Sequence, residues 1–154
     1  MLRSFPTFSA LLLLCCVSRV AALSNKAIGA EYPSELLNSA AQMGICVDLG
    51  CGDASLATML AVKGNLVIHA LESDEALVKA ARQKLQQRNL YGQVTVERLY
   101  SATLPYADNL INILIAEKPG DGSVPGGVSE SEIMRVLAPN GVAWFKRDGN
   151  WTAV

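Results

Sequence analysis

The fold of this chain is decided by the stretch Gly44-Ile-Cys-Val-Asp-Leu-Gly-Cys-Gly-Asp-Ala-Ser55. Its apolar part, residues 45–49, is typical of a short buried β-strand. Gly50 and Gly52 then allow a sharp turn and a close approach of the backbone to a ligand, and Asp53 is placed to cap the helix that follows. A strand, a glycine turn and a helix in this order predict a loop whose backbone N–H groups meet a nucleotide-like cofactor.

The charges around this turn distinguish two classes of cofactor. A dinucleotide places its pyrophosphate over a turn with three glycines spaced G-x-G-x-x-G, but the third position here is Ser55. Asp48 and Asp53 surround the turn with negative charge, which repels a pyrophosphate and suits a ligand that carries an ammonium and a sulfonium. The residues therefore favour S-adenosylmethionine and disfavour a nucleotide-dependent oxidoreductase.

The same stretch resembles the first motif of class I S-adenosylmethionine-dependent methyltransferases, hydrophobic-Asp-x-Gly-x-Gly-x-Gly, with Ala54 in place of the last glycine. The second motif of that family is an acid at the end of the second strand. Leu66-Val-Ile-His-Ala-Leu-Glu72 supplies it, and the resemblance implies that Glu72 accepts hydrogen bonds from both ribose hydroxyls. The plainer interpretation of Glu72 is a solvated acid just before a helix.

Later segments extend the resemblance over about residues 44 to 147. Residues 132–145 resemble the family's late helix-to-strand element, Arg-Val-Leu-Lys-Pro-Gly-Gly. Two departures are visible: Tyr100-Ser101-Ala102 stands where an acid often binds the adenine amino group, and Asn112 stands where Asp is common. The resemblance implies cofactor contacts at Asp48, Gly50, Cys51, Gly52, Glu72, Ser73, Ser101, Ala102 and Glu117.

No catalytic residue is assigned, because methyl transfer in this family depends largely on alignment of the reactants. Tyr106, Asp108 and Glu117 are placed near the expected methyl-transfer face, although each has an ordinary role as a loop or strand-end residue. The expected acceptor is a small molecule or a protein side chain.

The pattern along the chain alternates between strands and helices. Strands are predicted at 45–50, 66–72, 94–100, 111–117 and 142–147, and helices at 32–43, 54–63, 74–89 and 129–137. This order predicts an α/β fold with a doubly wound, mostly parallel sheet, the Rossmann-like methyltransferase fold. The resembled family has seven strands, so we expect this sheet to be incomplete at its carboxyl-terminal side.

The first residues predict a secretory signal peptide at 1–22. Met1-Leu-Arg3 is basic, residues 8–17 are apolar, and Val20-Ala-Ala22 is a small-residue cleavage site. We therefore expect a secreted or periplasmic protein with no stable membrane span after cleavage. The remaining divisions are a leader and N-terminal helix at 23–43, the methyltransferase-like domain at 44–147 and the start of a linker at 148–154.

The signal peptide and the polar tail together resemble the methyltransferase-like amino-terminal region of secreted bacterial proteins that continue into a PQQ-type β-propeller. A second hypothesis is a non-catalytic secreted module for binding or interaction. The export signal, the missing adenine acid and the missing later strands favour this second hypothesis.

Composition excludes other classes of function. The chain has 154 residues with 13 basic and 14 acidic side chains, and no basic stripe with interleaved aromatic residues, so no nucleic-acid partner is expected. The single histidine, His69, lies in an apolar strand pattern, and Cys46 and Cys51 are too close in sequence for a useful disulfide. No metal site is expected.

Overall fold

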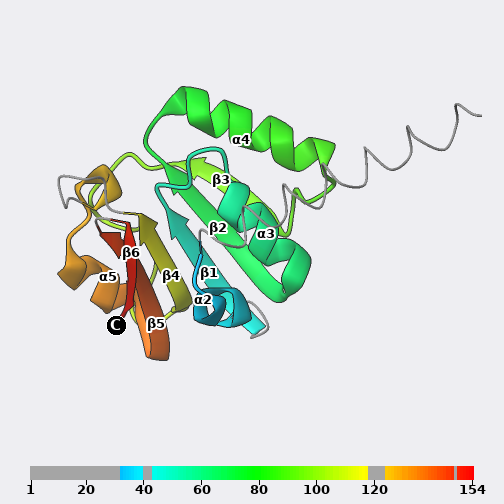
Figure 1. Ribbon diagram of the computed structural model, residues 1–154. Coiled ribbons are helices and arrows are strands. Elements are labelled where there is room, and N and C mark those ends of the chain that lie inside the picture. Colours follow the sequence, from blue (N-terminus) through cyan, green and yellow to red (C-terminus); the bar gives the residue numbers. More distant parts are fainter. Residues whose placement is uncertain (1–31, 40–42, 118–123, 148) are drawn as a thin grey trace, which may run out of the picture. The chain divides into compact units, whose positions relative to one another are not determined.

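The computed structural model describes residues 32–39, 43–117, 124–147 and 149–154. The predicted signal peptide lies outside the described residues, as does the leader up to residue 31. Residues Ser34–Val154 form one compact unit, whose strands make a single six-stranded sheet in the order β3-β2-β1-β4-β5-β6 (Figure 1).

The elements of this unit follow the predicted alternation. The strands are β1 (Met43–Leu49), β2 (Asn65–Glu72), β3 (Val94–Arg98), β4 (Ile111–Glu117), β5 (Leu137–Arg147) and β6 (Asn150–Ala153). The helices are α2 (Ser34–Ser39), α3 (Ser55–Lys63), α4 (Glu75–Gln87) and α5 (Glu130–Val136), with a 3-10 turn η1 (Pro125–Gly127).

The sheet is mixed but mostly parallel, as predicted. The strands β3, β2, β1, β4 and β5 run parallel to one another, and only β6 is antiparallel, to β5. The parallel register aligns the carboxyl ends of β1, β2 and β4 at one edge of the sheet. That edge is where open α/β sheets bind their ligands.

The carboxyl-terminal hairpin differs from the prediction. Residues 150–153 were expected to begin a linker, but they form β6, and β5 begins at Leu137, earlier than expected. Gly149, at φ 79°, adopts the left-handed backbone that a tight hairpin turn requires. Pairing of Phe145 with Thr152 and of Lys146 with Trp151 then supplies the hydrogen bonds that a short polar segment cannot provide alone.

Alternate residues along the strands face opposite sides of the sheet. Val47, Leu49 and Leu71 lie in one core cluster with Ile133 and Val136 of α5. Asp48, which lies between Val47 and Leu49, and Glu72, which follows Leu71, therefore face the opposite side of the sheet. The helices α3 and α4 pack against β2 and β3.

The helix ends follow local capping chemistry, with one departure at the glycine turn. Asp74 caps α4 by accepting a hydrogen bond from the N–H of Ala76 at 2.7 Å. The helix α3 begins after Ala54, which adopts left-handed angles of φ 57° and ψ 31° and gives no side-chain cap. Ala54 therefore takes the backbone conformation that glycine adopts more easily. Within the described part of the chain, no helix has the length and apolar character needed to cross a membrane.

Candidate functional site

The glycine turn between β1 and α3 is tied to the end of β2. Gly50 and Cys51 both donate their N–H groups to the carbonyl of Leu71, at 2.8 and 3.2 Å. Gly52 donates its N–H to Oε2 of Glu72 at 2.9 Å. Strand β2 thus already accepts the hydrogen bonds of these three amides, and their contact with a cofactor stays a prediction.

Glu72 organises the turn and the start of α4 together. Its Oε1 accepts hydrogen bonds from the N–H groups of Ser73 and Asp74, at 2.7 and 3.2 Å, while Oε2 holds Gly52. Its exposed fraction is 8%, so the interpretation as a solvated acid is wrong. An ionised carboxylate offers about four lone-pair sites, and therefore Oε2 keeps capacity to accept a hydrogen bond from a ligand hydroxyl.

Asp48 carries the most unusual electrostatics of the site. It is 2% exposed, and its Oδ2 has no hydrogen-bond partner among the described residues. Burial, and then the charges of Glu117 and Glu72, raise the pKa of Asp48 to about 7. A buried carboxylate oxygen without a donor is a place where a cationic or N–H-bearing ligand group would gain a partner.

Asp53, the other acid predicted to surround the turn, is neutralised by a contact that the sequence did not indicate. Lys84 of α4 places its Nζ 2.7 Å from Oδ2 of Asp53 and 2.6 Å from Oγ of Ser55. Partial burial raises the pKa of Asp53, but the bonds from Lys84 and Ser55 outweigh it and lower the pKa overall. The negative potential around Asp48 therefore comes from Glu117 and Glu72, and not from Asp53.

The remaining predicted contacts lie at or near the same edge. Ser73 donates its hydroxyl to Oε1 of Glu72 at 3.3 Å, and Cys51 is buried, with burial raising the pKa of its thiol. Glu117 ends β4 half-buried, 3.5 Å from Nζ of Lys146. Ser101 and Ala102 are exposed beyond the end of β3.

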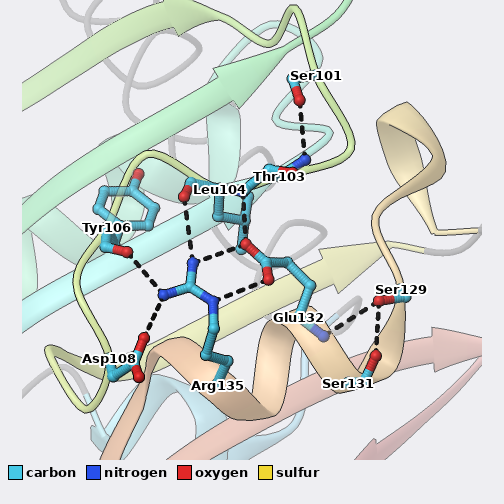
Figure 2. A network of polar contacts seen from close by, with 9 residues as sticks. All are labelled: Ser101, Thr103, Leu104, Tyr106, Asp108, Ser129, Ser131, Glu132 and Arg135. Carbon is cyan, nitrogen blue, oxygen red and sulfur yellow. Dashed lines mark hydrogen bonds and ion pairs between the residues drawn. The ribbon is translucent and has the colours of Figure 1, made fainter.

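Asp108 and the backbone of Tyr106 belong to a different network, centred on Arg135 (Figure 2). Arg135 Nη1 contacts Oδ1 of Asp108 at 2.5 Å and the carbonyl of Tyr106 at 3.0 Å. Glu132 binds the same guanidinium through both carboxylate oxygens, at 2.9 and 2.7 Å, and the hydrogen bonds from Arg135 lower the pKa of Glu132 to about 2. This network fastens the loop before β4 to α5, so we assign Asp108 to structure and not to the methyl-transfer face.

The side chain of Tyr106 is bound to β2. Its hydroxyl lies 2.7 Å from Nδ1 of His69, and Nε2 of His69 lies 3.5 Å from Oε2 of Glu97. His69 is thus a hydrogen-bonded strand residue, as the sequence indicated. In the part of the chain that the structure describes, no three histidine, cysteine or acidic side chains are grouped to hold a metal ion.

Replacing Tyr106 with phenylalanine tests this structural assignment. We expect Tyr106→Phe to lower the free energy of unfolding by about 1 kcal/mol, because the half-buried His69 loses a hydrogen-bond partner. Thermal denaturation at neutral pH would measure the loss. Cofactor affinity should stay unchanged in the folded variant, and a large loss of affinity would return Tyr106 to the binding site.

The turn η1 also borders the site. The turn η1 packs on the glycine turn: a Cβ built on Gly50 would lie 2.5 Å from Cγ of Pro125. The sequence showed residues 118–128 only as a glycine- and proline-rich loop. The sequence signal for this contact is the pair Gly126-Gly127, because both residues adopt a positive φ in the structure, 69° and 70°.

Comparison with known protein families agrees with this geometry. The methyltransferase domain family matches residues 46–141, which include the glycine turn, Glu72 and the strands up to the start of β5. The chain belongs to this methyltransferase domain family. The match covers more than half of the chain, and it begins inside β1, two residues before Asp48.

Solved structures of methyltransferase-domain proteins and their relatives share the fold. A putative S-adenosyl-L-methionine-dependent methyltransferase from Methanococcus maripaludis is 18% identical with a TM-score of 0.65, covering 96% of this chain and 67% of its own. A putative sarcosine dimethylglycine methyltransferase from Galdieria sulphuraria is 18% identical with a TM-score of 0.61, covering 84% of this chain and 48% of its own.

The cyclase SpnF has the same fold as well. It is 24% identical with a TM-score of 0.60, and the match covers 72% of this chain and 43% of SpnF. The chain therefore spans less than half of the length of SpnF. No curated protein matches the chain. At these identities the solved structures establish the Rossmann-like methyltransferase fold of the domain and nothing finer.

Proposed function

We propose that this methyltransferase-like domain binds S-adenosylmethionine at the carboxyl edge of its sheet. The observation that carries the proposal is the buried Oδ2 of Asp48, which has no partner among the described residues and lies in a negative potential. The ammonium of the cofactor's methionine part is a donor that would satisfy this oxygen. Oε2 of Glu72 supports the proposal, because it keeps an acceptor site for a ribose hydroxyl.

The residues of the chain would bind and orient the reactants. When bound, S-adenosylmethionine supplies a methyl group activated by its sulfonium. Asp48 and Glu72 would hold the cofactor, together with the rim residues Cys51, Ser73, Ser101, Ala102 and Glu117. Alignment of an acceptor nucleophile with that methyl group would account for most of the rate. We propose a small molecule or a protein side chain as the acceptor.

Calorimetry of the full chain tests the proposal. We expect S-adenosylmethionine and its demethylated product to bind with micromolar affinity, whereas NAD should give no heat, because the acidic edge repels its pyrophosphate. Equal binding of NAD would favour an oxidoreductase. The absence of heat with all three ligands would overturn the proposed function.

A second candidate function is a non-catalytic module. The occupied amides of Gly50, Cys51 and Gly52 favour it, as does the packing of Pro125 against Gly50. Since SpnF, with this fold, carries the name of a cyclase, the fold alone does not establish methyl transfer. Cofactor binding without transfer of a radiolabelled methyl group to any acceptor in a lysate of the source cells would support this candidate.

We also propose that residues 1–22 are a cleaved signal peptide, which would make the domain secreted or periplasmic. The basic start, apolar run and small-residue site support this. In the same proposal the domain is the amino-terminal part of a protein that continues into a PQQ-type β-propeller. Amino-terminal sequencing of the exported protein tests the cleavage, and the downstream reading frame tests the fusion.

A further inference from the structure

The turn η1 is held at both of its ends by the core. Val124 and Val128, which flank it, are 7% and 3% exposed and belong to the cluster around Leu49 and Leu71. Within the turn, the N–H of Gly127 binds the carbonyl of Val124 at 3.1 Å. The flanking valines therefore fix where the tip, Pro125-Gly126, is placed.

The tip lies between two residues that follow β1 and β3. On one side, a Cβ on Gly50 would come 2.5 Å from Cγ of Pro125. On the other side, a Cβ on Gly126 would overlap Cδ2 of Leu99. Glycine suits position 126, because its φ of 69° is strained for other residues and because an added Cβ would displace the side chain of Leu99.

Both of these neighbours are bound to the end of β2. Gly50 donates to the carbonyl of Leu71 at 2.8 Å, and Leu99 donates to the carbonyl of Glu72 at 2.9 Å. Because β2 lies between β1 and β3 in the sheet, a tip that contacts Gly50 and Leu99 crosses the carboxyl end of β2. This is the end where Glu72 would receive a sugar.

We propose that η1 is a gate on the nucleoside end of the cofactor site, and this inference rests on the proposed function. In the observed position the tip and a sugar on Glu72 compete for the end of β2. Binding then requires the tip to leave Gly50 and Leu99, and the measured affinity is reduced by the fraction of molecules in which the gate is closed. Two consecutive glycines favour the open gate, because they regain the most backbone freedom on release.

The two glycines of the turn provide a matched pair of variants. Gly126→Ala and Gly127→Ala carry the same backbone cost at nearly equal φ, but the new Cβ meets Leu99 at position 126 and no atom of the described residues within 4 Å at position 127. We expect S-adenosylhomocysteine to bind Gly126→Ala about tenfold more tightly than the unmodified chain, with Gly127→Ala between the two. Pro125→Ala, which removes the ring from Gly50, should tighten binding about threefold without altering either glycine.

The affinity for S-adenosylhomocysteine, by calorimetry, and the rate of hydrogen exchange at residues 124–128 would be measured on the same full-length proteins. The gate predicts faster exchange in Gly126→Ala than in Gly127→Ala, and faster exchange in the unmodified chain when ligand is added. Equal or weaker binding by Gly126→Ala relative to Gly127→Ala would show that η1 is a wall of the site and would overturn the gate. Absence of binding in all four proteins would overturn the proposed function, and the gate with it.

Discussion

Asp48→Asn is expected to weaken binding of S-adenosylmethionine by about 100-fold, because a buried carboxylate that pairs with a cationic ligand group contributes about 3 kcal/mol. The same change should stabilise the protein without ligand at pH 8 by an amount on the order of 2 kcal/mol. Binding and stability move in opposite directions because the ionised Asp48 is buried, has no donor to Oδ2 among the described residues and is repelled by Glu117 and Glu72.

The pH dependence follows from the direction of the pKa shift. The pKa of Asp48 rises from 3.8 to about 7 on folding, so the folded state holds a proton that the unfolded state releases. The stability of the unmodified chain should therefore fall as the pH rises from about 4 to 7 and then level off, and the advantage of Asp48→Asn should grow over the same range. Chemical denaturation at several pH values would measure both curves.

Binding should also release protons near pH 7, because a cationic ligand group lowers the pKa of Asp48 towards its ordinary value. Calorimetry in two buffers with different ionisation enthalpies measures this release. Asp48→Asn should abolish the component that comes from this carboxylate. Unchanged affinity in Asp48→Asn would remove Asp48 from the cofactor site, whatever its effect on stability.

Glu72→Ala is expected to abolish measurable cofactor binding and to lower the free energy of unfolding by about 3 kcal/mol, because the N–H groups of Gly52, Ser73 and Asp74 lose their acceptor. Glu72→Gln should have a smaller effect on stability, since its remaining carbonyl oxygen still accepts from Ser73 and Asp74. Its amide would face the N–H of Gly52, so the glycine turn loses its partner and binding should stay weak.

The variant Asp74→Ala distinguishes the loss of a direct contact with the cofactor from the loss of structure at the start of α4. Asp74→Ala removes the cap of α4 and should cost about 1 kcal/mol, yet Asp74 makes its side-chain contact with Ala76. We expect Asp74→Ala to keep the affinity of the unmodified chain. If it loses affinity as Glu72→Ala does, the effect of Glu72 comes from the start of α4 and not from contact with the sugar.

Secondary structure was predicted best where the residues of a segment are themselves enough to specify a strand or a helix. The strand β4 was expected at residues 111–117 and is found there, because its apolar run is long and buried. The strand β6 was missed, since a short polar segment becomes a strand only by pairing with β5. In α4 the buried residues are Val78, Ala81 and Leu85, whereas Leu77 is 38% exposed, because packing against the sheet decides which apolar residues of the helix are covered.

For the glycine turn, the sequence predicted the bend but not its tertiary contacts. Its sequence indicated the bend and the acid that follows β1, because glycine and aspartate act through their own backbone and charge. Where its amides point was decided by β2, and the charge of Asp53 was neutralised by Lys84, which is 31 residues away. No local pattern encodes these contacts.

The sequence by itself determined the order of strands and helices, the sharp bend after β1 and the placement of acids at the strand ends, because periodicity, glycine and charge act over a few residues. Only the tertiary structure decided that Asp48 lies buried with an oxygen that no described residue pairs and that Pro125 covers Gly50. Both depend on packing between segments distant in the chain, where burial turns an ordinary carboxylate into a strongly perturbed one.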